Sequence, residues 1–93
     1  MGLSTIEMKR GHALPVDEAK RRLNRIAGEL NKKYGIETAW NRNDLEFQGK
    51  YASGRIRVKE EELDVFVDLS VVLMPFKANV KKELRASLER DFV

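Results

Sequence analysis

Few residues in this sequence have the types and spacing that catalysis needs. The chain has one histidine, His12, and no cysteine, and none of its four serines sits in a Gly-x-Ser-x-Gly elbow. Thiolate chemistry and cysteine-based zinc binding are therefore excluded. His12 falls between a predicted strand and a predicted helix, where we expect its ring to bond nearby backbone rather than act as a general acid or base. The sequence thus predicts no catalytic residue, no cofactor and a protein that is not an enzyme.

One acidic cluster has the residue types of a metal site. Glu60, Glu61 and Glu62 are consecutive, whereas a metal ion needs oxygen ligands that converge on one point. The alternation on either side places these residues in a tight turn, which splays their side chains apart. We interpret the cluster as a solvated turn that also discourages edge-to-edge strand pairing, and we predict no metal site.

Basic residues recur along one side of a predicted helix, and their chemistry suits anions. The stripe could contact phosphates, anions of a granule surface or an acidic protein. Glu18 and Glu29 interrupt it, so an ordinary solvated face is the alternative. Nucleic acid is the less favoured partner, because the sequence has no helix-turn-helix, no zinc finger and no aromatic pair on a strand surface. The residues of the stripe are Arg21, Arg22, Arg25 and Lys32.

A second candidate surface centres on Phe66. This side chain belongs to the wet face of an alternating stretch whose other members carry opposite charges that can partner across strands. With Leu3 or Ala39 beside it, Phe66 would centre a contact patch for a partner protein or a second copy of the chain. A cavity for an apolar ligand is a further alternative, although a filled core is the simpler interpretation. The bulky residues that would border such a cavity are Trp40, Phe47 and Phe76.

Two helices must position these groups. Apolar residues three and four apart predict a helix over residues 16–34, with Tyr34 on its inward stripe and Gly35 after its end. Gly28 lies on the outer face of this helix, where packing against a sheet does not explain it. A second helix is predicted over residues 70–92, beginning regularly near Met74 because Pro75 belongs in a first turn. Its N-cap would be Ser70, and its inward stripe would be Val72, Leu73, Phe76, Val80, Leu84, Leu88 and Phe92.

Alternating apolar residues predict the strands. One covers residues 3–10, a hairpin covers 36–41 and 44–49, and a longer hairpin covers 54–69 with its turn at Glu60-Glu61. The patterns favour pairing of Trp40 with Leu45, Thr38 with Phe47, Val58 with Leu63 and Ile56 with Val65.

The element order is therefore β-α-β-β-β-β-α. It predicts an α+β fold, a two-layer sandwich in which two helices pack on one face of a mostly antiparallel sheet of about five strands. The apolar face of residues 54–69 would pack under the helices, and the opposite face of the sheet would be exposed to solvent. The pattern does not give the order of the strands in the sheet.

Length and composition agree with one domain spanning residues 1–93. The chain is 42% hydrophobic and 35% charged, with a net charge of +3, which is typical of a folded protein. Residues 1–34 hold the basic excess, with eight Lys and Arg against four Asp and Glu. No run approaches the roughly 20 apolar residues of a membrane span. The missing cysteines and the absence of a signal-peptide pattern favour a cytoplasmic location.

Several motifs, taken together, resemble a family of small bacterial proteins. They are His12-Ala13-Leu14-Pro15, Gly35 and Trp40, Leu45-Glu46-Phe47, Gly54-Arg55-Ile56-Arg57-Val58, Leu63-Asp64-Val65-Phe66-Val67-Asp68-Leu69, and a final helix with Leu73, Phe76, Lys77, Val80 and Glu83. Over nearly its whole length the chain resembles the polyhydroxyalkanoic acid system, or granule-region, proteins. Pro75 departs from the pattern expected at the start of the last helix.

The resemblance implies an association with storage-polyester metabolism and supplies no catalytic residues. The leading hypothesis is a non-enzymatic binding module whose partner is a protein or the surface of a polyester granule. The alternatives are a nucleic-acid or ribosome-associated protein that uses the basic helix face, and a small carrier of apolar ligands. A homodimer is also compatible with the sequence.

Overall fold

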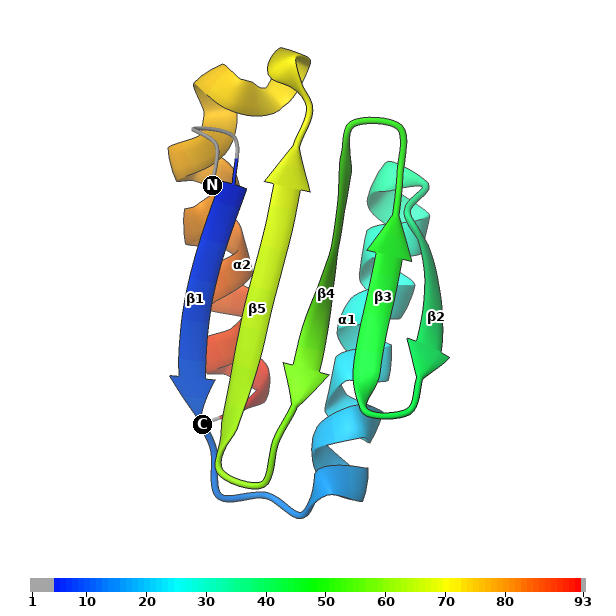
Figure 1. Ribbon diagram of the computed structural model, residues 1–93, viewed down its shortest axis with the longest axis vertical. Coiled ribbons are helices and arrows are strands. Elements are labelled where there is room, and N and C mark those ends of the chain that lie inside the picture. The colour runs from blue at the N-terminus through cyan, green and yellow to red at the C-terminus, as the bar shows by residue number, and fades with distance from the viewer. Residues whose placement is uncertain (1–4, 93) are drawn as a thin grey trace.

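The strands form one antiparallel sheet in the order β1-β5-β4-β3-β2. The computed structural model describes residues 5–92, and its strands are β1 (Thr5–Gly11), β2 (Glu37–Asn41), β3 (Asp44–Gln48), β4 (Ala52–Val58) and β5 (Glu62–Leu69). Both helices, α1 (Val16–Tyr34) and α2 (Lys77–Asp91), lie on the same face of this sheet (Figure 1). The predicted α+β class, the element order and the two layers are confirmed. The first strand, which the sequence left unplaced, lies at an edge beside β5.

The two hairpins have the registers that the alternation predicts. Trp40 lies opposite Leu45 and Thr38 opposite Phe47, while Val58 lies opposite Leu63 and Ile56 opposite Val65. Gly54 faces β5 so closely that a Cβ atom on it would overlap the backbone of Phe66. Glycine at this position therefore allows β4 and β5 to approach.

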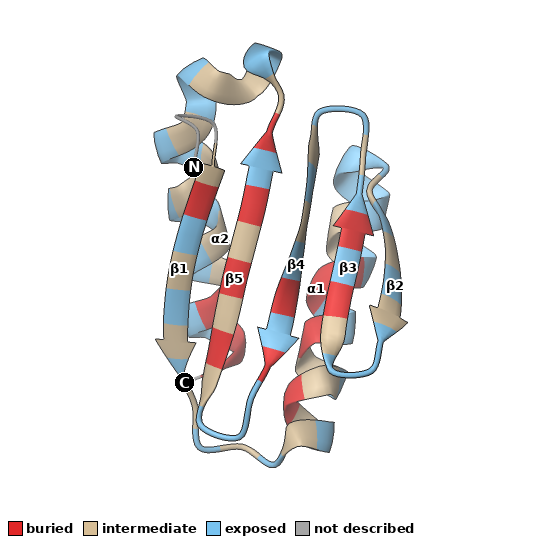
Figure 2. Cartoon of the chain, viewed as in Figure 1, coloured by how far each residue is buried: buried red, intermediate tan, exposed pale blue. Residues whose placement is uncertain are grey.

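The core lies between the sheet and the helices. Buried residues alternate with half-buried or exposed ones along β4 and β5, as the colours of Figure 2 show. The buried positions therefore share one face of the sheet and belong to the same core as residues of the helices. α1 contributes Ala19, Leu23, Ile26 and Ala27 to this core. The alternation of residues 54–69 thus commits one sheet face to packing, and the opposite face is open to solvent. No helix within residues 5–92 is long and apolar enough to cross a bilayer.

α1 has the boundaries and the termini that its sequence predicts. Pro15 precedes the helix, where a missing N–H costs nothing, and Asp17 and Glu18 lie in the first turn. Gly35 closes the helix in the left-handed conformation, with φ of 66° and its N–H bonded to the carbonyls of Leu30 and Asn31. The prediction that Tyr34 faces inward is wrong, because its side chain is 59% exposed. Tyr34 is the last residue of the helix, and its hydroxyl donates a hydrogen bond to Glu83 of α2 at 3.3 Å.

The C-terminal segment differs most from its prediction. A 3-10 helix, η1 (Val71–Phe76), precedes α2, so the regular helix begins three residues after the predicted start at Met74. Pro75 lacks the N–H that an α-helix would use there, and its ring disfavours the α conformation at Met74. The tighter 3-10 winding also changes the phase of the side chains. Val72 and Phe76 are consequently exposed and not buried as predicted, and the side chain of Ser70 makes no cap.

Candidate interaction surfaces

His12 links three parts of the chain through backbone bonds, as expected for a structural role. Its Nδ1 accepts a hydrogen bond from the N–H of Leu14 at 3.1 Å. The other ring nitrogen, Nε2, therefore carries the proton and donates to the carbonyl of Lys59 at 2.7 Å. The ring also meets Phe92 edge to face, with 6.1 Å between centroids. Both nitrogens are thus occupied within the fold.

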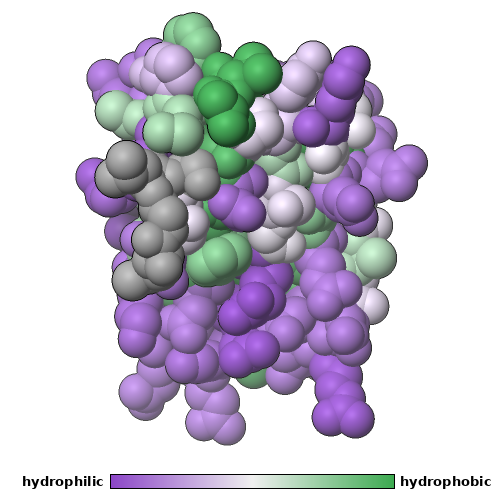
Figure 3. All heavy atoms as spheres, turned by 45° about the horizontal axis from the view of Figure 1, so that its top comes forward, coloured by the Kyte–Doolittle hydropathy of each residue, from purple (hydrophilic) through white to green (hydrophobic). Residues whose placement is uncertain are grey.

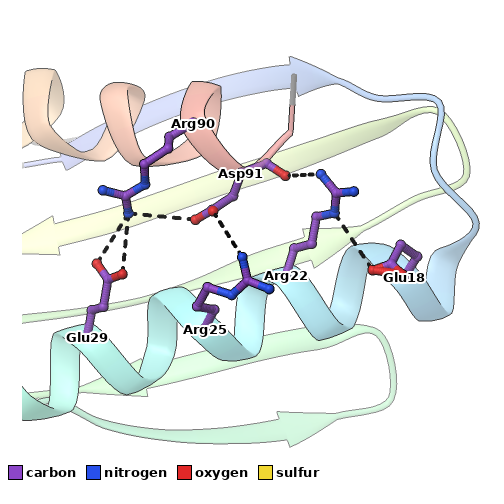
Figure 4. Close-up of polar contacts among 6 residues, drawn as sticks. All are labelled: Glu18, Arg22, Arg25, Glu29, Arg90 and Asp91. Carbon is purple, nitrogen blue, oxygen red and sulfur yellow. Dashed lines mark hydrogen bonds and ion pairs between the residues drawn. The ribbon is translucent and has the colours of Figure 1, made fainter.

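Two of the predicted basic stripe residues hold the end of α2 against α1. Arg22 donates from Nη1 to the backbone carbonyl of Asp91 at 2.6 Å, and Arg25 lies 3.8 Å from the Asp91 carboxylate (Figure 4). Arg21 pairs with Glu18 on its own helix at 3.5 Å. Lys32 lies exposed in the last turn. Arg22 and Arg25 are thus engaged in contacts with α2, whereas Arg21 and Lys32 lie on the solvent-exposed side of α1.

Asp91 lies at the centre of a polar cluster between the two helices, which we call the interhelix cluster. Its other members are Arg22, Arg25, Glu29 and Arg90. Its side chain is only 6% exposed, and it lies between Arg25 and Arg90, the latter 3.7 Å from Oδ2. Arg90 also bonds to Glu29 of α1 at 3.3–3.4 Å. A buried carboxylate needs such cations close by, because desolvation penalises its charge. The cluster therefore connects the C-terminal end of α2 to α1.

Alternating charges cross the open sheet face in register. One row runs Lys9, Asp64, Arg57, Asp44 across four strands. Hydrogen bonds from Arg57 hold the pKa of Asp44 below its ordinary value, and a hydrogen bond from Lys59 does the same for the pKa of Asp64. These charges therefore partner one another, as predicted for a solvated face.

Phe66 lies within this charged face and is half-buried. The guanidinium of Arg55, its cross-strand neighbour, lies 5.5 Å from the ring centroid. A shallow hollow beside it is bordered by charged residues of β1, β4 and β5. Ala39 does not adjoin Phe66, since β4 and β3 lie between their strands, and Leu3 falls outside the described residues. Phe66 as a contact point stays a prediction.

Three exposed apolar side chains lie elsewhere, on η1. Val71 is 81% exposed, Val72 64% and Phe76 53%, and we call these three residues the apolar tip. They occupy one end of the molecule, where Figure 3 shows apolar side chains gathered. Tyr51, also exposed, lies at the same end because its carbonyl accepts a hydrogen bond from Ser70 N–H at 2.8 Å. Sequence reasoning missed this surface because helical spacing placed Val72 and Phe76 in the core.

Lysines follow the apolar tip along the chain. Residues 70–82 contain Lys77, Lys81 and Lys82 and no acidic residue, so the first turn of α2 has no acidic side chain. Lys77 is the lysine that lies in this turn, where a positive charge opposes the helix dipole. No side chain caps the start of α2, and η1 buries no residue. The apolar tip therefore adds little to the stability of the fold, because its side chains remain in water.

The interior offers no support for the apolar-ligand carrier. Trp40 donates a hydrogen bond to Asn24 at 2.7 Å and lies under Lys20, Phe47 is buried in the core, and Phe76 is exposed on the tip. The three aromatic residues therefore do not border a common cavity. Within residues 5–92 no three His, Asp or Glu side chains gather into a group that could hold a metal ion.

Comparison with models of protein families identifies the family of the chain. A family model described as "Putative polyhydroxyalkanoic acid system protein" matches residues 6–92. No curated protein and no solved structure matches the chain. The matched span includes both helices, the interhelix cluster and the apolar tip.

Proposed function

Because the chain belongs to the family of polyhydroxyalkanoic acid system proteins, we propose that it is a cytoplasmic, non-enzymatic module that binds the surface of polyester granules. The family description refers to a storage-polyester system and to no reaction. The residues that could do chemistry are engaged in structure, since both ring nitrogens of His12 bond to backbone. A binding role is therefore the interpretation that the side chains favour.

The apolar tip is the observation that carries this proposal. Complete burial of a Val or Phe side chain contributes roughly 1.5–3 kcal/mol, and all three tip residues are more than half exposed. Covering them would contribute on the order of 3–6 kcal/mol before the cost of immobilising the protein. The tip projects from one end of an elongated molecule, 36 Å by 22 Å by 22 Å, so a flat surface can cover it without steric conflict with the sheet.

Co-sedimentation with amorphous polyhydroxybutyrate particles tests this function. The wild-type chain should sediment with the particles, and the double variant V72S/F76S should lose at least nine-tenths of this binding. Circular dichroism and thermal unfolding of the variant should stay unchanged, because both side chains are exposed. A wild-type chain that remains in the supernatant, or a double variant that binds normally, would contradict the proposal.

The alternative nucleic-acid function has weaker support. Arg22 and Arg25 contact Asp91, which leaves less of the basic stripe to meet phosphates. Replacement of the exposed Arg21 and Lys32 by Glu should leave particle binding intact under the granule hypothesis. A low-salt gel shift that is abolished by the same variant would instead favour nucleic acid.

A further inference from the structure

We infer that two copies of the chain associate through the free edge of β2, so that their two sheets join into one. The strand order places β3 on one side of β2 and, within residues 5–92, no strand on the other. The inference does not depend on the proposed function, because the apolar tip lies on η1, away from β2 (Figure 1).

The hydrogen bonds of the neighbouring strand show which backbone groups of β2 point outward. Val58 N–H bonds to the carbonyl of Asn43 at 2.8 Å, so the odd-numbered residues of 43–48 bond to β4 and the even-numbered ones bond to β2. Those even-numbered residues lie opposite the odd-numbered residues of β2. The even-numbered residues of β2, Thr38 and Trp40, therefore direct their N–H and C=O groups away from the sheet. Within the described part of the chain, no strand or side chain bonds to these groups.

α1 leaves this edge uncovered. A hollow lies between α1 and β2, and the residues that border it include Asn24, Gly28, Asn31 and Thr38. A Cβ atom on Gly28 would meet nothing within 4 Å, although glycine inside a helix costs stability relative to alanine. Gly28 thus has no role in packing against the sheet, but it keeps space open beside the edge of β2.

The other edge of the sheet, β1, is protected against such pairing. Its charged residues are Glu7, Lys9 and Arg10, and charged side chains on an edge strand deter association with another strand. Arg10 also lies 3.8 Å from Glu89 of α2, so a helix side chain lies beside this edge. In β2, by contrast, Glu37 is the only charged residue, and the strand has neither proline nor lysine. The sheet therefore has one protected edge and one edge that is open to pairing.

A second copy complements this edge in an antiparallel register centred on Ala39. With the two-fold axis at Ala39, Thr38 of each copy lies opposite Trp40 of the other, and all of their outward N–H and C=O groups pair. Glu37 then lies opposite Asn41 of the second copy, so no like charges face each other. A shift of two residues in either direction would leave part of β2 without a partner strand. The charges and the backbone groups of β2 thus favour a second copy of the same strand.

The same register gives the hollow an occupant. Trp40 faces α1, since its Nε1 donates a hydrogen bond to Asn24 at 2.7 Å, and Thr38 borders the hollow on the same side of the sheet. Trp40 of the second copy, opposite Thr38, would therefore lie beside the space that Gly28 keeps open. The two α1 helices do not collide, because each lies behind β3 of its own copy (Figure 1). At about 4.8 Å per strand their axes would be roughly 14 Å apart, which exceeds the roughly 8–10 Å between packed helices.

Cysteine crosslinking tests the register, because the chain has no cysteine of its own. The two Ala39 Cα atoms would form a non-hydrogen-bonded pair about 4.5 Å apart, which a disulfide can span. Ala39→Cys should therefore form a disulfide-linked dimer under mild oxidation. Glu46→Cys is the matched control, since Glu46 is exposed and lies opposite Ala39 on β3, one strand further from the axis. It should crosslink at least tenfold more slowly, and equal rates in the two variants would overturn the inference.

Sedimentation equilibrium tests the dimer itself. A small interface gives weak association, so at about 100 μM the wild-type chain should sediment with twice its mass of 10.7 kDa and dissociate on dilution. Ala39→Glu and Ala39→Lys each place two like charges at the axis and should each be monomeric. An equimolar mixture of the two variants should regain the dimer, because opposite charges then meet there. Misfolded variants could not give this rescue.

The other outcomes identify what else could occupy the edge. A wild-type chain that stays monomeric at this concentration would overturn the inference and leave the edge of β2 to a strand of another protein. A dimer that persists in both Ala39 variants would also overturn it, because the contact would then lie on another surface, such as the sheet face around Phe66.

Discussion

The two helices lie on the same face of the sheet but differ in construction. α1 buries four residues, ends in a left-handed glycine and carries acids in its first turn and lysines in its last. α2 buries only Leu88 and Asp91, has no side-chain cap and begins with a lysine. The glycine terminus and the placement of charges in α1 favour the folded state, whereas Gly28 does not, and neither helix has a side-chain cap. The start of α2 relies on a few contacts with its surroundings. The difference indicates that α1 contributes more to stability than the η1–α2 end does.

The largest expected difference between the two helices is the loss of stability when a leucine is shortened to alanine. Leu23 of α1 is fully buried and Leu84 of α2 is only partly so. Leu23→Ala should lower the free energy of unfolding by about 2–5 kcal/mol, because it leaves a cavity in the core, and Leu84→Ala should cost about 1 kcal/mol. Urea denaturation measures both. Equal losses would mean that α2 is anchored as firmly as α1.

The interhelix cluster gives a smaller effect. Asp91→Asn removes the buried charge that Arg25 and Arg90 face, and it should cost about 1–2 kcal/mol in free energy of unfolding. Glu29→Gln is the matched control, since this exposed carboxylate pairs only at the surface with Arg90, and it should change stability by about 0.5 kcal/mol or less. An Asp91 variant as stable as the wild type would show that the interhelix cluster does not stabilise the packing of α2 on α1.

Glycine and alanine exchanges probe the two helices at exposed positions. A Cβ atom on Gly28 would meet no atom within 4 Å, so Gly28→Ala should stabilise the protein by about 0.5–1 kcal/mol. The reverse exchange in α2, Ala78→Gly, should cost a similar amount if its first turn is as fully formed as the middle of α1. A much smaller cost, measured by thermal unfolding, would reveal fraying at the start of α2.

The contact between Tyr34 and Glu83 gives the smallest signal. The negative charge of Glu83 is the main cause that raises the pKa of Tyr34, followed by slight burial and the hydrogen bond. A raised pKa in the folded state means that this contribution to stability is complete below the unfolded-state pKa and is lost as pH rises through the folded-state pKa. Glu83→Gln should therefore lower the pKa of Tyr34 toward its ordinary value.

Ultraviolet titration in a Tyr51→Phe background measures this pKa. If the wild-type and Glu83→Gln chains titrated at the same pH, Glu83 would not stay near α1 in solution.

Elements whose signals are local could be predicted from the sequence. The boundaries of α1 follow from Pro15, its apolar spacing and Gly35, which all point to the same ends. The registers of the hairpins follow because a slip of one residue would turn Ile56 and Val58 toward water. The order of the strands cannot be derived from the sequence, since the apolar alternation of β1 would be the same whichever strand it paired with.

The apolar tip could not be predicted because hydrophobic spacing reports the period of a segment and not its burial. Val72, Phe76 and Val80 are spaced like one helical face, yet only Val80 packs against the core. Pro75 was the available signal. A proline at this point favours an irregular lead-in that turns its side chains away from the sheet. The basic stripe illustrates the converse case, since sequence showed its charges but could not show that Asp91, far along the chain, would contact Arg25.

The position of β1 also affects the order in which the protein can assemble. Thr5 pairs with Asp68, 63 positions later, whereas β2 to β5 form a run of neighbours joined by short turns. Pairing between neighbouring strands costs little chain entropy and is fast. Pairing of β1 with β5 closes a long loop, and its larger entropic cost must be offset by contacts formed elsewhere. β1 must therefore wait for β5, and the sheet gains its edge strand only after the residues between them have been synthesised.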